Sequence, residues 1–171
     1  MGMYPAGNVI TLTPAVLTAA YADDEVGLDS VEIPNAVSNR GGVSRLIGIT
    51  MVCKDAGLAP DGEMYFHTND QSWGTAGAAV TITDAQMFDA GILGWVLCDG
   101  NDWKTNSSTS DSAAFVFTLN AKENDPHTFK SFLLKAAEGS TSVYFSFHPN
   151  VAWDFESTSD LQISFHIEYL G

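Results

Sequence analysis

Hydrophobic and polar residues alternate with a period of two along much of this chain. The clearest runs are LQISFHIEY (161–169) and SVYFSFH (142–148). A period of two places one set of side chains in a core and the other in solvent, so both runs are predicted to be half-buried β-strands. The residues predicted to face solvent are Gln162, Ser164, His166, Glu168, Ser142, Tyr144, Ser146 and His148.

Further runs of the same kind predict more strands. They are VSRLIGITMVCK (43–54), AAFVFTLN (113–120), FKSFLLK (129–135) and NVITLTPAVLTAAY (8–21). In the run 43–54 the predicted core face consists of Val43, Ile47, Ile49, Met51 and Cys53. Pro14 has no N–H for a ladder hydrogen bond, so the first strand is expected at a sheet edge or with a bulge.

Turn and helix signals separate these runs. The stretch APDGE (59–63) predicts a tight turn before MYFHT. Thr83 and Gln86 have the spacing of a capping box, and Gly91 can end a helix of about two turns. About eight strands and one short helix predict an all-β fold, a single-domain β-sandwich that is jelly-roll-like. Residues 1–20 are expected to form an N-terminal arm and first strand, and 21–171 the β-sandwich, as one domain overall.

The net charge of the chain limits the classes of partner that it can bind. The chain has 171 residues, 7 basic and 21 acidic, with a net charge of −14. This field repels phosphate backbones and anionic lipid, so neither nucleic acid nor a membrane is expected as a partner. No stretch approaches the roughly 20 apolar residues of a membrane span, and the N-terminus does not resemble a signal peptide.

Cys53 and Cys98 lie in apolar runs and are interpreted as buried free thiols, with a disulfide as the alternative.

The acidic stretch YADDEVGLDSVEIPNA (21–36) is the first candidate for a metal site. An EF-hand loop needs Gly at its sixth position and Glu at its twelfth, and neither register from Asp23 or Asp24 fits. A calcium site of another geometry remains an alternative to a solvated, acidic connection between two strands. We expect no metal and no cofactor.

Catalytic motifs are absent from the sequence. His67, His127, His148 and His166 share no metal-ligand spacing, and there is no nucleophile elbow. His148 and His166 are expected at the surface. A small β-sandwich hydrolase therefore stays a disfavoured hypothesis, and no catalytic residue is assigned; we expect that the protein is not an enzyme.

The four tryptophans raise the possibility of sugar binding. Trp95 lies in an apolar run and is expected in the core, whereas Trp73, Trp103 and Trp153 lie beside turn residues and are expected to be exposable. Tryptophans in loops can stack against sugar rings, but they also cover the ends of a β-sandwich or fill a subunit interface. The stretch CDGNDWKTNSSTSDS (98–112) is predicted to be a long exposed loop.

An ordered set of segments resembles a known family. The segments are YADDEVGLDSVEIPNA, RGGVSRLIGITMVCKDAG, GEMYFHTND, VTITDAQMFDAGILGWV, STSVYFSF and LQISFHIEYLG. From about Tyr21 to Gly171, the chain is similar to small virion proteins of tailed bacteriophages, the β-sandwich proteins that decorate or cement heads. The acidic charge and the insert-like 98–112 stretch depart from that pattern.

This resemblance implies a structural virion protein. The implied role is a capsid decoration (cement) protein, a homotrimer on the outer capsid surface, bound to the major capsid protein and assembled in the host cytoplasm. The alternative is a tail- or fibre-associated adhesin that binds host surface glycan. Met3 and Tyr4 in an uncharged arm, Arg40 and Arg45 around the GGVS turn, and Trp103 are the predicted partner contacts.

Overall fold

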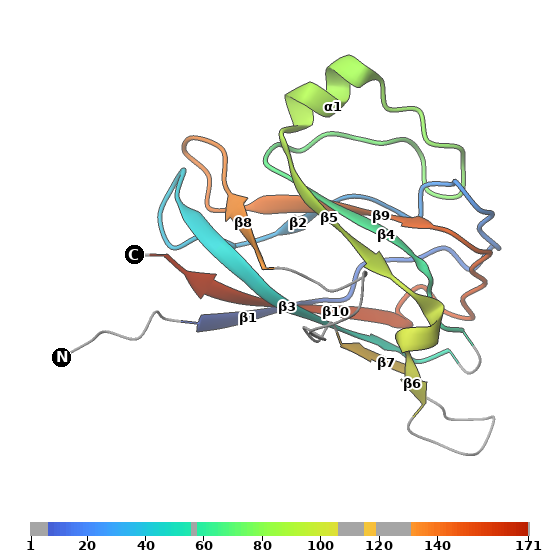
Figure 1. Cartoon of the computed structure of the whole chain (residues 1–171). Coiled ribbons are helices and arrows are strands. Elements are labelled where there is room, and N and C mark those ends of the chain that lie inside the picture. Colours follow the sequence, from blue (N-terminus) through green and yellow to red (C-terminus); the bar gives the residue numbers. More distant parts are fainter. Residues whose placement is uncertain (1–6, 56–57, 106–114, 119–130, 171) are drawn as a thin grey trace.

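Two antiparallel β-sheets stack face to face to form the molecule (Figure 1). The structure is a computed structural model that describes residues 7–55, 58–105, 115–118 and 131–170. The prediction of an all-β sandwich with one short helix is confirmed in this part of the chain.

One sheet has six strands, in the order β1-β10-β3-β7-β6, with β8 also paired to β3. Their bounds are β1 Gly7–Leu12, β3 Val43–Cys53, β6 Lys104–Thr105, β7 Phe115–Thr118, β8 Phe132–Lys135 and β10 Leu161–Tyr169. The strands β7 and β8 pair with opposite ends of β3, so together they fill the place beside β3 that one longer strand would take.

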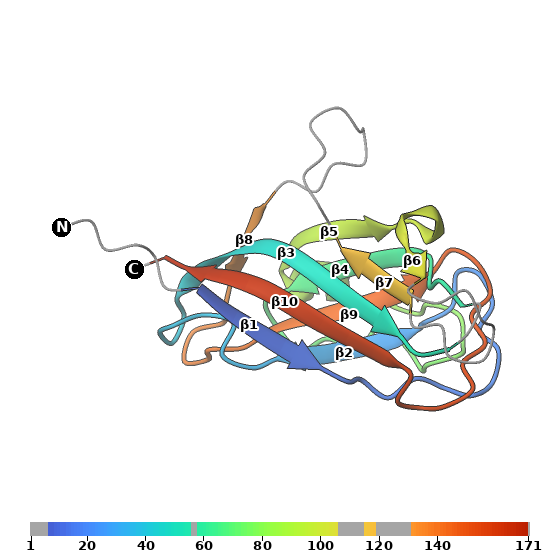
Figure 2. The same ribbon diagram turned by 90° about the horizontal axis from the view of Figure 1, so that it is seen from below.

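The second sheet has four strands, in the order β2-β9-β4-β5. Their bounds are β2 Leu28–Ile33, β4 Gly62–His67, β5 Ile92–Cys98 and β9 Val143–Pro149. Antiparallel pairs form between β1 and β10, β2 and β9, β3 and β7 with β8, and β4 and β5. This is one long hairpin wrapped into two sheets, which is the jelly-roll arrangement (Figure 2).

The core lies between the sheets and is built from the apolar faces of the alternating strands. At its centre the ring of Phe165 on β10 lies 5.0 Å from Phe145 and 5.9 Å from Phe66, which belong to the opposite sheet. Cys53 and Cys98 are buried free thiols, as predicted. Burial raises the pKa of Cys53 to about 12 and also raises the pKa of Cys98, so both stay protonated.

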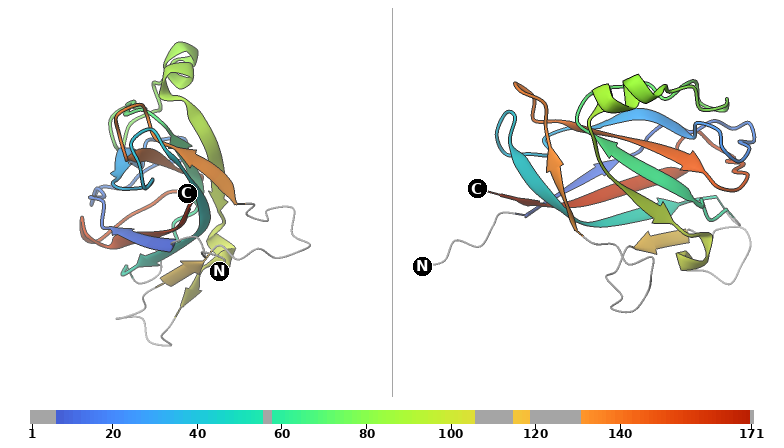
Figure 3. Two further views of the ribbon diagram at one scale, coloured as in Figure 1. Left: turned by 90° about the vertical axis from the view of Figure 1, so that its left-hand side faces the viewer. Right: turned by 45° about the horizontal axis from the view of Figure 1, so that its top comes forward.

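The helix α1 (Asp84–Ala90) has the predicted ends and lies outside the sandwich at the start of β5 (Figure 3). The Thr83 hydroxyl accepts from the Gln86 N–H, and the Gln86 side chain accepts from the Thr83 N–H, which completes the capping box. Gly91 has φ of 67°, a left-handed conformation in which glycine carries no Cβ penalty.

Two strand predictions need correction. In β3 the pairing with β10 shifts between His166 and Ile167, so Ile47 is an extra residue and 50% exposed, while Leu46 faces the core. A bulge moves every following side chain by one position, which the alternation of the sequence does not reveal. The first strand lies at a sheet edge, as expected, but it ends at Leu12, before Pro14.

Two loop predictions also change. The acidic stretch 21–36 is not only a connection, because residues 28–33 form β2. The predicted exposed loop 98–112 contains the end of β5, a 3₁₀ helix at Gly100–Asp102 and β6, while residues 106–112 lie outside the described part. None of the helices in the described residues is long and apolar enough to span a membrane.

Candidate partner-contact site

Two turns meet at one end of the sandwich and position the predicted contact residue Arg40. In the first turn Gly42 N donates to the Asn39 carbonyl (2.8 Å), and Gly41 has φ of 67°. The second turn follows β8, and the two are joined by Gly41 N donating to the Ser140 carbonyl at 2.8 Å. Positive φ favours glycine, so the RGG sequence shapes the turn that presents Arg40 to solvent.

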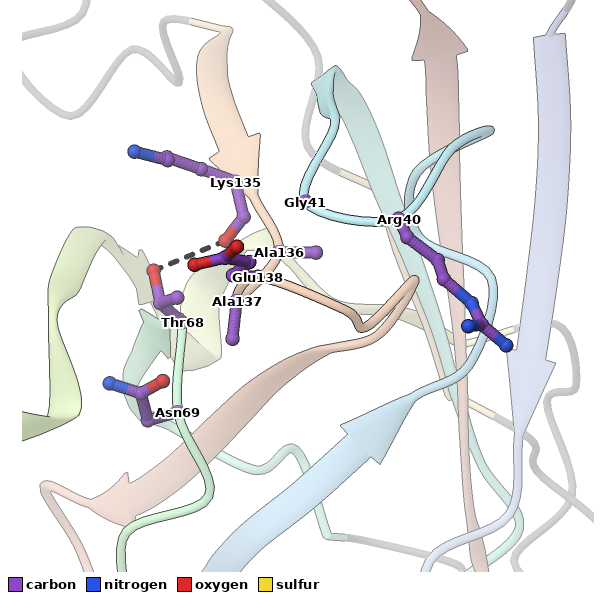
Figure 4. A pocket seen from close by; sticks show the side chains of 8 residues that line it. All are labelled: Arg40, Gly41, Thr68, Asn69, Lys135, Ala136, Ala137 and Glu138. Carbon is purple, nitrogen blue, oxygen red and sulfur yellow. Dashed lines mark hydrogen bonds between the residues drawn. The ribbon is translucent and has the colours of Figure 1, made fainter.

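A cavity of about 540 Å³ lies between these turns and the end of β4. Its lining residues are Arg40, Gly41, Thr68, Asn69, Lys135, Ala136, Ala137 and Glu138 (Figure 4). Thr68 Oγ1 donates to the Lys135 carbonyl at 3.1 Å. The Arg40 side chain extends away from those of Lys135 and Glu138, so its guanidinium is free to meet a group outside the cavity (Figure 4).

Arg45 already has a partner. Its Nη1 lies 2.9 Å from Glu168 Oε2, with the two side chains 43% and 23% exposed. This is the alternative in which an arginine pairs with the chain's own acid. Within the described residues Arg45–Glu168 is the one salt bridge, and Arg40 has no hydrogen-bond or ion-pair partner there.

The positive charges gather at this end of the molecule. The described part of the chain holds five cationic side chains, and Arg40, Arg45 and Lys135 are three of them, the others being Lys54 and Lys104. Val43, three residues after Arg40, pairs with Lys135, and Arg45 pairs with Leu133. Gly7, where β1 begins, lies opposite Glu168, and Glu168 lies opposite Arg45. The N-terminal segment therefore enters the sheet beside these cations; the predicted contacts Met3 and Tyr4 lie outside the described residues.

The prediction that Trp73, Trp103 and Trp153 are exposed is wrong, because all three are buried. Trp103, a predicted partner contact, is therefore not available at the surface. Trp103 is 6% exposed, and its indole N–H donates to the Pro60 carbonyl at 3.0 Å. Trp73 is 4% exposed and Trp153 is fully buried. The Trp73 ring packs on His148, and the Trp153 ring packs on Phe147. Trp95, predicted in the core, is 56% exposed on the outer face of β5, opposite Tyr65.

A second cluster, which the sequence analysis missed, lies on the outer face of the four-stranded sheet. His148 is 7% exposed rather than at the surface, and its ring lies 4.9 Å from Trp73 and 5.8 Å from Tyr65. Burial lowers the pKa of His148 and likewise that of His67, so both rings are neutral at pH 7. The only signal for it in the sequence is the pair of histidines that follow apolar residues in FHT and FHP.

The site thus has two parts. The cationic end consists of Arg40, Arg45 and Lys135, and the histidine cluster consists of His67, His148, Tyr65 and Trp73. The described residues hold no group of three or more His, Cys, Asp or Glu side chains suited to a metal ion. The cationic end can bind a carboxylate through Arg40, because a planar guanidinium matches two carboxylate oxygens. No protein-family model matches the chain, and no curated protein sequence matches it.

Proposed function

We propose that the protein is a capsid decoration protein that binds the outer surface of a phage head and stabilises it. The observation that carries the proposal is the gathering of Arg40, Arg45 and Lys135 at one end of a strongly acidic chain, beside the point where the N-terminal segment enters the sheet. Such a molecule can attach by that end and leave its acidic surface toward solvent.

The charge of the chain favours attachment through its cationic side chains. The chain has 7 basic against 21 acidic residues, so attraction to a partner through its few exposed cations requires carboxylates on that partner. Arg40 is exposed and unpaired among the described residues, so it can form a bidentate pair without first breaking an internal one. The proposed partner is the major capsid protein, the proposed form is a homotrimer, and the proposed location is the virion.

Binding to undecorated heads tests this proposal. Arg40→Ala with Lys135→Ala should reduce occupancy at least tenfold, and removal of residues 1–6 should reduce it separately. Lys54→Ala is the matched control, because Lys54 is also exposed but lies at the other end of β3, about 35 Å away for an 11-residue strand. Each variant is first shown to fold by circular dichroism. Wild-type occupancy for both test variants would refute attachment by this end.

A second candidate function is glycan binding by a tail- or fibre-associated adhesin. Trp95 supports it, since an exposed indole on the outer face of a sheet can stack against a sugar ring. A glycan array should then show binding that Trp95→Ala abolishes and that Phe88→Ala, another exposed apolar residue, retains. The number of copies per virion separates the two functions: hundreds of copies indicate the head, and a few dozen or fewer indicate the tail.

A further inference from the structure

The segment 68–82, which we name the strap, covers the outer face of the four-stranded sheet. It leaves the end of β4, passes over the sheet and reaches the start of α1 (Figure 1, the green segment between β4 and α1). The strap inserts Trp73, whose ring lies 5.0 Å from Tyr65, 4.9 Å from His148 and 6.1 Å from His67. It thereby buries a face that the alternation of β4 and β9 would otherwise leave in solvent.

A bulge in β2 holds the strap in place. Leu28 pairs with Phe147 and Val31 with Phe145, so Asp29 and Ser30 together lie opposite the single residue Ser146. Such a bulge redirects side chains out of the ladder. Asp29 accepts hydrogen bonds from Trp73 N (2.6 Å) and Ser72 Oγ (2.7 Å). These contacts fix the strap at Trp73.

Further contacts continue along the strap. The Ser30 hydroxyl donates to Asp70 at 2.6 Å. Beyond Trp73, Gly77 N donates to the Val26 carbonyl and Val26 N to the Ala78 carbonyl, each at 2.9 Å. Apart from the Trp73 ring, the strap is thus held mainly by hydrogen bonds rather than by the apolar core.

His67 lies beneath the strap in a network that requires a neutral ring. Its Nδ1 lies 2.7 Å from the Asn69 carbonyl, which can only accept, so Nδ1 carries the proton. Its Nε2 lies 3.3 Å from Ser146 Oγ, which also accepts from Ser30 N at 3.2 Å. The Ser146 hydroxyl proton therefore points to Nε2. A second proton on His67 would turn that acceptor into a donor and leave the Ser146 hydroxyl without this partner.

His148 is less well satisfied. Neither of its ring nitrogens has a hydrogen-bond partner in the described structure, and the same holds for the indole nitrogen of Trp73 beside it. The ring does interact with the Glu25 backbone, without full hydrogen-bond geometry. An added proton would place a second unsatisfied donor and a charge under the strap.

Acidic groups surround both histidines and oppose this effect in part. Asp29 of β2 and Glu63 of β4 face His148, and Asp29 together with Asp70 of the strap faces His67. Tyr65 of β4 and Tyr144 of β9 also contact the rings, and Tyr65 donates to Glu63. Burial outweighs the carboxylates at each ring, and the pKa of each is lowered.

We propose that the strap is an acid-released cover, which stays closed over the sheet at neutral pH and opens when His67 and His148 take up protons. The inference is independent of the proposed attachment to a capsid. Opening uncovers Tyr65 and carries Trp73 away with the strap. Tyr65 and the already exposed Trp95, which lies opposite it, would then form an aromatic surface on the four-stranded sheet.

The direction of the pH effect follows from proton uptake. In the opened state both rings are exposed and regain an ordinary pKa of about 6.5, whereas in the closed state they remain neutral to lower pH. The closed state is therefore fully stable above about pH 6.5 and loses stability as the pH falls from there. Each unit by which a closed-state pKa is lowered is a tenfold change in the opening equilibrium.

Opening of the strap leaves the core of the sandwich intact. On β9, Phe145 and Phe147 point to the core side of the same sheet, and Phe66 does so on β4. The core residues thus keep their contacts when the strap leaves. The strap is expected to open at a lower free energy than global unfolding, as a separate unit.

Hydrogen exchange of the full chain between pH 7.5 and 5.0, corrected for intrinsic rates, tests the proposal. Strap amides, with Trp73 and Gly77 as reporters, should be less protected than those of Ile49 and Phe165 in β3 and β10 at every pH. Their protection should fall at least tenfold by pH 5.0. Protection that equals that of the core amides, or that does not change with pH, would overturn the inference.

Variants and a direct titration complete the test. His148→Phe combined with His67→Gln should remove the pH response, whereas His166→Gln, on the outer face of the other sheet, should keep it. In the wild-type protein, nuclear magnetic resonance should show two histidines with a pKa below 6.5, assigned to His67 and His148. An ordinary or raised pKa at either ring refutes the mechanism even if the double variant fails to fold.

Discussion

Asp29, one of the residues of the acidic stretch 21–36, has a defined structural role: it holds the strap on β2. Its two carboxylate oxygens accept from Trp73 N and Ser72 Oγ, at 2.6 and 2.7 Å, and so fasten the strap to β2. Asp29→Ala removes both acceptors and leaves the Trp73 N–H, on a residue that is almost fully buried, without a partner. Ser72 is exposed and can bond to water instead, so the loss at Ser72 is small.

The magnitude follows from the Trp73 bond. A hydrogen bond to a charged group contributes about 1.5–3 kcal/mol, and an unsatisfied buried donor costs a similar amount. Because Asp29 is itself only half-buried, we expect Asp29→Ala to lower the free energy of unfolding by about 2 kcal/mol. Asp29→Asn keeps a carbonyl acceptor for Trp73 and should lose about half as much.

Urea unfolding followed by tryptophan fluorescence and circular dichroism measures this loss. Asp23→Ala is the matched control, since Asp23 lies in the same acidic stretch, is exposed, and should change the free energy by less than about 0.5 kcal/mol. If Asp29→Ala is as stable as Asp23→Ala, the carboxylate does not hold the strap, and the reasoning about the bulge in β2 is wrong.

Four further predictions address other parts of the molecule. A Cβ on Gly62 would lie 2.2 Å from the His148 carbonyl oxygen, so Gly62→Ala should lower the urea midpoint with a loss of about 1–3 kcal/mol, while Gly48→Ala, whose nearest neighbour atom is 3.7 Å away, should change it far less. Arg45→Ala removes a partly exposed ion pair with Glu168 and should cost no more than about 1 kcal/mol by thermal unfolding; a larger loss would show that the pair is better shielded than its exposure indicates. EDTA should leave the melting temperature unchanged within about one degree, because the described residues offer no metal-ligand group; a fall that calcium reverses would restore the calcium hypothesis. Light scattering should give three times the 18.3 kDa chain mass if the trimer forms in solution, and a monomer at high concentration would contradict a stable trimer.

Local patterns were sufficient for the fold class. The alternation in 142–148 and 161–169 predicted β9 and β10, because side chains on a strand alternate between two faces whatever the strand pairs with. The ends of α1 were predictable for the same reason: the Thr83–Gln86 box and Gly91 act within one turn of the chain. The buried free state of both cysteines followed from their apolar surroundings.

The alternation of hydrophobic and polar residues did not predict the bulges in β2 and β3. In β3 the sequence favours Ile47 as a core residue, and only the pairing with β10 shows that Ile47 is the extra residue and Leu46 faces inward. In β2 the bulge at Asp29 and Ser30 determines which acidic side chain has a structural role. A bulge depends on two strands far apart in the sequence, so neither strand alone predicts it.

The candidate site was predicted in part. Arg40 was assigned from its turn and is exposed, while the gathering of Lys135 with Arg40 depends on β8 pairing with β3 across about 90 residues. Trp103 and Trp95 were assigned to the wrong environments. By itself the sequence determined which residues share the face of a strand, because backbone geometry within the strand sets that. Only the tertiary structure decided what covers each face, because the strap that lays Trp73 over His148 is held by contacts with β2, which lies some 40 residues earlier in the chain.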